Sequence, residues 1–353
     1  KRWMGVIFSV LIILIYAVGY NMLAAYNLQS TFSVFKFYHP VITPAFIGVI
    51  LAFLFGVMVL GGAKRLASIT EILVPFMGIL YVLVSLLIIF LNIRNVPGMF
   101  ASIFRNAFDF QSVMGGFSGS CIMYGVKRGL YSNEAGMGSA PNAAATASVS
   151  HPAKQGLVQM LSVFIDTLLI CPCSAMMVLI FFVQDPEAAA ALNGMPLVQM
   201  AVNNSVGEFG IHFITFAIFA FAFSSLIGNY FYAENNLRFI KGDSKALLFV
   251  FRVVCLCVVF YGAVNSFDLA WNLADIFMAL VNLIALLFLG KWALAALDDY
   301  TRQRKEGIDP VFVADRIPGM PKTECWHVSE VHDYGKPPVK EYLDDALDPE
   351  YVG

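Results

Sequence analysis

Charge is scarce in this sequence, and the residue patterns that catalysis or nucleic-acid binding needs are missing. Charged residues make up 13% of the 353 residues and apolar residues 59%. Soluble domains carry about 25% charged and about 45–50% apolar residues. No basic stretch is interleaved with aromatic residues, which excludes a nucleic-acid-binding face. No histidine or carboxylate pair shares one depth of an apolar run, so we predict no enzyme, and an intramembrane enzyme is the weakest alternative.

The six cysteines predict neither a metal centre nor a disulfide framework. Five lie inside apolar runs, and the spacings in "CPC" and "CLC" are not those of zinc sites. We expect small apolar side chains there and no organic cofactor. A signal peptide is also missing, because the chain opens with "KRWMGVIF" and enters an apolar run at once. Since no initiator methionine is present, we expect the later portion of a longer protein.

What the sequence does contain is a series of long apolar runs, with a mean hydropathy of +0.74. A helix needs about 20 mostly apolar residues to cross a membrane. Seven runs qualify, at residues 3–27, 42–62, 66–92, 156–183, 209–236, 245–263 and 267–290. A broken element at about 111–147 brings the expected number of crossings to about eight. Two amphipathic pieces, 98–108 and 195–206, are predicted at the membrane interface, and the fold class is an all-α integral membrane protein.

The distribution of lysine and arginine predicts the orientation. Basic residues near helix ends mark the cytoplasmic side, and eight crossings place most of them on one side. They are Lys1, Arg2, Lys64, Arg65, Lys127, Arg128, Lys154, Arg238, Lys241, Lys245, Lys291, Arg302, Arg304 and Lys305. From about Asp298 the composition is polar. We expect a transmembrane domain at 1–297 and a tail at 298–353, with both chain ends cytoplasmic and the protein in the cell membrane.

The polar stretch "RGLYSNEAGMGSAP", residues 128–141, interrupts the apolar chain with three glycines and a proline. Backbone groups cannot stay unpaired in hydrocarbon, so a break at membrane depth lines a cavity or packs in protein. Secondary transporters build their mid-membrane sites from such breaks, because helix ends direct dipoles and free carbonyls at the ligand. We predict a transporter site here. The alternative is a re-entrant loop, or a helix end with a polar cytoplasmic connection.

Polar residues also lie inside other runs. Ser224 and Ser225 are adjacent and about midway along their run, and two such hydroxyls can ligate a small cation or bond back to a carbonyl one turn earlier. Asn229, one turn further on, can bind a substrate or bridge two helices. Asp166, in "VFIDTLL", is an ionisable residue within a span, which indicates a functional site or a pairing inside the bundle.

Several long stretches, in this order along the chain, resemble the alanine/glycine:cation symporter family, the sodium–alanine symporters. They are "AKRLASITEILVPFMGILYVL" (63–83), "GVKRGLYSNEAGMGSAPNAAATA" (125–147), "HPAKQGLVQMLSVFIDTLLIC" (151–171), "AFSSLIGNYFYAENN" (222–236) and "WNLADIF" (271–277). The resemblance covers about residues 1–295.

The resemblance implies a LeuT-like fold of two inverted five-helix repeats, with one discontinuous helix. Residues 1–297 would supply the third to tenth core helices and lack the first ones. It implies sodium as the coupling ion, held by Ser224 and Ser225. The substrate-binding residues that it implies are Asn21, Gly125, Gly129, Tyr131, Ser132, Asn133, Ser225 and Asn229. We therefore expect a sodium-coupled symporter that imports alanine or glycine by alternating access, with membrane lipid as a further partner.

Two positions depart from the family pattern. Many members have glutamine where this chain has Ala24, and some have tryptophan where it has Asn229. The smaller side chains leave room for a larger amino acid or for water. The alternatives are thus a symporter for a larger neutral amino acid, coupling to protons, or a truncated homologue that does not transport or that acts as an amino-acid sensor.

Overall fold

The computed structural model describes most of the chain as helices. The described residues are 2–60, 63–107, 125, 129, 132–134, 136–242, 244–265, 269–321, 323 and 326, and they contain no strand. They form two compact units, the first of Lys1–Met137 with Ile165–Ala279 and the second of Gly138–Phe164 with Leu280–Gly353. The all-α membrane architecture predicted from the sequence is confirmed.

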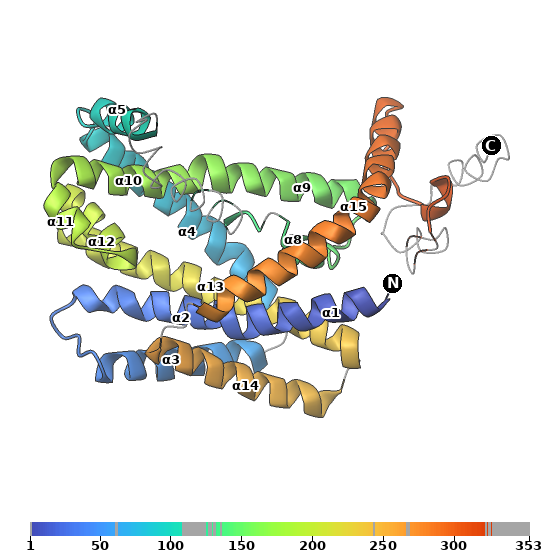
Figure 1. Ribbon diagram of the computed structural model, residues 1–353, viewed down its shortest axis with the longest axis horizontal. Helices are drawn as coiled ribbons and strands as arrows, with labels where there is room; N and C mark the ends of the chain where they lie inside the picture. Colours follow the sequence, from blue (N-terminus) through green and yellow to red (C-terminus); the bar gives the residue numbers. More distant parts are fainter. Residues whose placement is uncertain are drawn as a thin grey trace. The chain divides into compact units, whose positions relative to one another are not determined.

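The first unit carries most of the helices (Figure 1). They are α1 (Arg2–Ile12), a π-helix (Ile13–Tyr20), α2 (Asn21–Ser30), a short 3₁₀-helix (Thr31–Val34), α3 (Ile42–Leu60), α4 (Ala63–Leu91), α5 (Val96–Ala107), a second π-helix (Asp166–Ile170), α10 (Cys171–Gln184), α11 (Pro186–Ala190), α12 (Gly194–Val206), α13 (Glu208–Lys241) and α14 (Lys245–Val264). The second unit contains α8 (Ser139–Ala144), and α9 (Pro152–Ile165) and α15 (Leu269–Lys305) run from one unit into the other.

Seven helical stretches of the described chain are long and apolar enough to cross a membrane, one for each predicted run. They cover Arg2–Val34, Ile42–Leu60, Glu71–Leu91, Pro152–Gln184, Glu208–Lys241, Lys245–Val264 and Met278–Lys305. Most of the predicted broken element lies outside the described residues, so the eighth crossing stays a prediction. The two amphipathic pieces are helices, α5 and α12.

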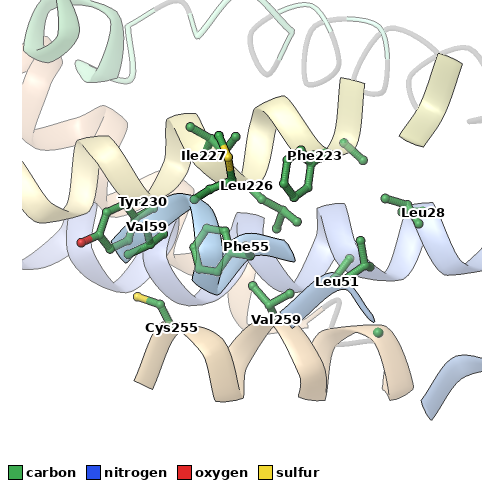
Figure 2. Packing of buried hydrophobic residues seen from close by; sticks show 14 of the residues in the cluster. Leu28, Leu51, Phe55, Val59, Phe223, Leu226, Ile227, Tyr230, Cys255 and Val259 are labelled. Atoms are coloured by element: carbon green, nitrogen blue, oxygen red, sulfur yellow. The ribbon is translucent and has the colours of Figure 1, made fainter. Parts of the chain in front are cut away.

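The main core lies where α2, α3, α13 and α14 meet. Figure 2 shows side chains from these helices pointing at one another, among them Phe55, Leu226 and Val259, all fully buried. Small residues bring the helices close together, as is usual in membranes. A Cβ atom at Gly262 of α14 would lie 2.4 Å from the Cα atom of Met22 on α2. The backbones of α2 and α14 are therefore in direct contact.

Partly buried charge also joins α13 to α14. Glu234 accepts hydrogen bonds from Arg238, one turn later on α13, and its carboxylate lies 3.6 Å from the guanidinium of Arg252 on α14. Arg252 Nε donates to the hydroxyl of Tyr230 at 3.0 Å. Charges inside a span need such partners, because hydrocarbon cannot solvate them. The network fixes α13, which also lines the cavity described below, against the core.

In the second unit the chain beyond α15 folds back onto the start of α9. Phe312 N donates to Ser150 O at 2.9 Å, and Lys154 pairs with Asp309 at 2.6 Å. Gln303 exchanges two hydrogen bonds with the backbone of Val311. His151 is fully buried, with the rings of Tyr300 and Phe312 beside it. Part of the polar segment that the sequence assigns to a tail is thus packed structure.

Replacing Gly262 with valine should destabilise the protein by about 1–3 kcal/mol, because the added side chain overlaps the backbone of Met22. Gly78→Val is the matched control, since nothing lies within 4 Å of a Cβ atom there. The measurement is the thermal unfolding midpoint of the purified protein in detergent. Equal midpoints for the two variants would contradict the close approach of α2 and α14.

Candidate functional site

A cavity of about 380 Å³ opens in the first unit, between α2 and α13. Its volume falls within the range of about 300–1,000 Å³ that is usual for small-molecule sites. The lining residues come from five segments of the chain. They are Tyr20, Leu23, Ala24, Asn27, Ser132, Glu134, Met195, Ile218, Phe221, Ala222, Ser225 and Asn229.

Helix α13 supplies one wall of the cavity and also part of the core. Ser225 and Asn229 are one turn apart and line the cavity, while Leu226 and Ile227 between them are buried in the core. This division follows from helical periodicity, which places residues four apart on the same face. Ser225 and Asn229 are therefore held in place by packing on the opposite side of their own helix.

The predicted serine pair has a more specific geometry than the sequence showed. Ser224 Oγ and Ser225 Oγ both donate to the carbonyl oxygen of Phe221, at 2.8 and 2.9 Å. Each hydroxyl donates its one proton in this bond, and the lone pairs of its oxygen are not used by the bond. The back-bonded arrangement is thus present, and it leaves oxygen lone pairs on two adjacent side chains. Such a donor set fits a hard monovalent cation.

The opposite wall is formed by α2 and the π-helix before it. Ala24 and Asn27 line the cavity from α2, and Tyr20 lines it from the π-helix. A π-helix has a widened turn and is frequent at functional sites. The ring of Tyr16, one turn earlier, packs edge-on against Tyr20, and its hydroxyl donates to Glu134 Oε1 at 3.1 Å.

The stretch predicted to break the helix, residues 128–141, contributes the remaining polar groups. Ser132 and Glu134 line the cavity, and Glu134 has a φ of 50°, in the left-handed region that few non-glycine residues adopt. Asn133, between them, is directed elsewhere, since its Oδ1 accepts from Thr167 Oγ1 at 2.8 Å. A carboxylate, hydroxyls and amides thus meet in one cavity whose other lining residues are apolar.

The structure brings together three of the predicted substrate-binding residues and not the others. Ser132, Ser225 and Asn229 share the cavity. Asn21 is fully buried and does not line the cavity, and its Nδ2 donates to Ala17 O at 3.1 Å. Gly125 and Gly129 are exposed and helical and are not among the lining residues. Tyr131 lies outside the described residues.

Sequence reasoning did not assign Glu134 or Asn27 to the site. Glu134 directly follows the two assigned residues Ser132 and Asn133, and a carboxylate at that place in the sequence could have indicated a further site residue. Asn27 is three residues beyond Ala24, so helical spacing places both on one face of α2. Met195 carries no polar signal, and only the folding of α12 brings it to the cavity.

Comparisons with known proteins identify relatives over nearly the whole chain. A sequence model described as the sodium:alanine symporter family matches residues 1–314. The chain is 41% identical to "Amino-acid carrier protein AlsT" of Bacillus subtilis, over 92% of this chain and 68% of that protein. It is 43% identical to "Probable sodium/glutamine symporter GlnT" of the same organism, over 94% of this chain and 68% of that protein. The "Sodium/proton-dependent alanine carrier protein" of Bacillus sp. (strain PS3) is 40% identical, over 79% and 66%.

The cavity predicts which positions of α2 water can reach. In a protein freed of its six native cysteines, Asn27→Cys should react with a charged thiol reagent, because Asn27 lines the cavity. Ala25→Cys is the matched control and should stay unreacted, since Ala25 is fully buried. The measurement is the rate of modification by mass spectrometry. Similar rates for the two cysteines would contradict the cavity as described.

Proposed function

The chain belongs to the sodium:alanine symporter family, and on that premise we propose that it imports a small neutral amino acid, alanine or glycine, together with sodium. It is a multi-pass membrane protein of a family of amino-acid transporters, not of enzymes. The observation that carries the finer proposal is the cavity, where Ser225 and Asn229 of α13 face Ala24 and Asn27 of α2.

The lining of the cavity suits a zwitterion. The carboxylate of Glu134 and the amide oxygens of Asn27 and Asn229 can accept from an ammonium group, and the amide nitrogens can donate to a carboxylate. Glu134 is oriented by Tyr16. Leu23, Ile218 and Ala222 supply the apolar surface that excludes water around a small side chain.

Sodium would be held beside the substrate by Ser224 Oγ and Ser225 Oγ. Both hydroxyls are ordered by the same Phe221 carbonyl, and Ser225 also lines the cavity. A bound cation there would favour the amino-acid carboxylate electrostatically, since charges interact strongly in an apolar surrounding. Contact with both ligands makes Ser225 the proposed link between ion and substrate.

The placement of the chain in the membrane is part of the same proposal. Residues 1–297 would form the third to tenth core helices of a LeuT-like fold, with eight crossings, a discontinuous helix around residues 125–134, and a tail at 298–353. The charge pattern supports cytoplasmic chain ends. Alternating access would then move the segment that carries Ser132 and Glu134.

A larger neutral amino acid with a side-chain amide is the second candidate. Ala24 and Asn229 are small, and with Asn27 they leave a cavity of about 380 Å³ with amide groups on both walls. Amides pair with a carboxamide through complementary donors and acceptors. A relative of 43% identity is named as a probable sodium/glutamine symporter.

Uptake into proteoliposomes tests the proposed function. Labelled alanine, glycine and glutamine would be offered under an inward sodium gradient, with potassium and an inward proton gradient as controls. Sodium-driven uptake of alanine or glycine is the expected result, and uptake of glutamine alone would establish the second candidate. Uptake driven by the proton gradient without sodium would show that the coupling ion is the proton and not sodium. Binding without uptake in any condition would indicate a sensor.

Removing the two hydroxyls should abolish the sodium dependence. In Ser224→Ala/Ser225→Ala, uptake with sodium should fall to the level seen with potassium, because two proposed ligands are lost. Ser162→Ala is the control, since that hydroxyl bonds only within its own helix, to Gln159 O at 2.7 Å. Unchanged sodium-driven uptake in the double variant would remove these serines from the ion site.

A bulkier residue at position 229 should raise the preference of the transporter for smaller amino acids. Asn229→Trp fills part of the cavity, so the preference for alanine over glutamine should rise about tenfold or more. The measurement is the ratio of kcat/KM for the two amino acids. Asn235→Trp serves as a control on the same helix, because Asn235 does not line the cavity. An unchanged ratio in Asn229→Trp would place the substrate elsewhere.

A further inference from the structure

Two neighbouring residues on the π-helix of the fourth span bind Ser132, which lines the cavity, and Asn133 beside it. Ser132 Oγ donates to Asp166 Oδ2 at 2.6 Å, and Thr167 Oγ1 donates to Asn133 Oδ1 at 2.8 Å. Both bonds join residues 34 positions apart in the sequence. We call these two bonds the 132–167 clasp.

The clasp sits on a local change in helix winding. Residues Asp166–Ile170 form a π-helix, after which α10 begins at Cys171. The Cys171 Sγ atom lies 3.5 Å from Ser132 Oγ and 3.8 Å from Asp166 Oδ2, so the widened turn directs both side chains at the same place. Such π-turns are rare and are frequent at functional sites.

The helix that carries the clasp is itself fastened to the bundle. Ser174 on α10 shares a 2.6 Å hydrogen bond with Tyr81 of α4, and Ser85 of α4 donates to Cys173 O at 3.2 Å. Tyr81 and Cys173 are buried in one apolar cluster. The clasp therefore connects the cavity wall to a fixed support.

The supported segment holds one residue in an uncommon backbone conformation. Asn133 N donates to Gly129 O and Met137 N to Glu134 O, and between them Glu134 has a positive φ. A residue in this region keeps its conformation only where its surroundings impose it. The clasp and the bond from Tyr16 to Glu134 are side-chain contacts that can do so.

We propose that Asp166 and Thr167 are positioning residues, which hold Ser132 and Glu134 at the cavity through the 132–167 clasp. This rests on the proposed function of the cavity. Asp166 acts as a hydrogen-bond acceptor and not as a charge in contact with the substrate, since it does not line the cavity. No lysine or arginine of the described chain lies within ion-pair distance of its carboxylate.

Paired variants distinguish the effect of losing a hydrogen bond from the effect of disturbing the fold. Thr167→Val keeps the shape and loses the donor, whereas Thr167→Ser keeps the donor. Asp166→Leu loses the acceptor, whereas Asp166→Asn keeps one. The KM for the transported amino acid should rise about tenfold in the Val and Leu variants, as expected for one lost hydrogen bond to a binding wall, and kcat should change less. The Ser and Asn variants should stay close to the wild type.

A structural role alone would lower the amount of folded protein and kcat while leaving KM unchanged, and that result would overturn the proposal. An Asn variant as impaired as the Leu variant would also overturn it, because the charge of Asp166 would then be what matters. Ser162→Ala, on the same span and outside the clasp, controls for general damage.

The clasp can also be measured without transport. With the other five cysteines replaced, the rate at which N-ethylmaleimide alkylates Cys171 reports on Ser132 and Asp166, which both contact its sulfur. The rate should differ from wild type in Asp166→Leu and Thr167→Val and not in Thr167→Ser. Identical rates in all four proteins would overturn the clasp, whereas absence of uptake by the wild type would contradict only the proposed function.

Discussion

Polar groups inside a membrane span must find their partners within the protein, because hydrocarbon supplies none. This constraint explains most of the non-apolar residues in the spans. Glu234 pairs with two arginines, and Gln199 of α12 donates to Thr31 O and to Thr215 Oγ1. Asp166 accepts from Ser132. The bonds of Gln199 and Asp166, and the contact of Glu234 with Arg252, each join two segments, so these polar residues also help to determine which helices meet.

The same constraint accounts for the position of the cavity. Six polar side chains gather at the cavity between α2 and α13, and close packing of α2 on α14 leaves no room for them on the other side. Gly262 permits that contact, and the core of Figure 2 holds the inner face of α13. The opposite face of α13, which lines the cavity, can then present Ser225 and Asn229 to a ligand. The groups of α2 and α13 that we propose to bind the solute are thus placed by packed helices, which is what selective recognition of a small solute requires.

The seven spans were predictable because long apolar runs are the strongest signal in a membrane sequence. The two π-helices were not, since nothing in "ILIYAVGY" or "DTLLI" distinguishes them from ordinary helix. Ser225 and Asn229 could be assigned from their spacing and from the family motifs, and both line the cavity. Asn21 lies on the same helix as the cavity-lining Asn27 but on a buried face, because a separation of six residues places two side chains about 120° apart around an α-helix. Thr167 was missed because a threonine in an apolar run carries no signal until its partner is known.

The central claim is that the cavity between α2 and α13 holds the amino acid. An experimental structure determined with the transported amino acid and sodium tests it most directly. The account predicts ligand density that contacts Asn229 and Ser225, with a cation on the side of Ser224. Density for the amino acid at any other place, with this cavity holding only water, would contradict it.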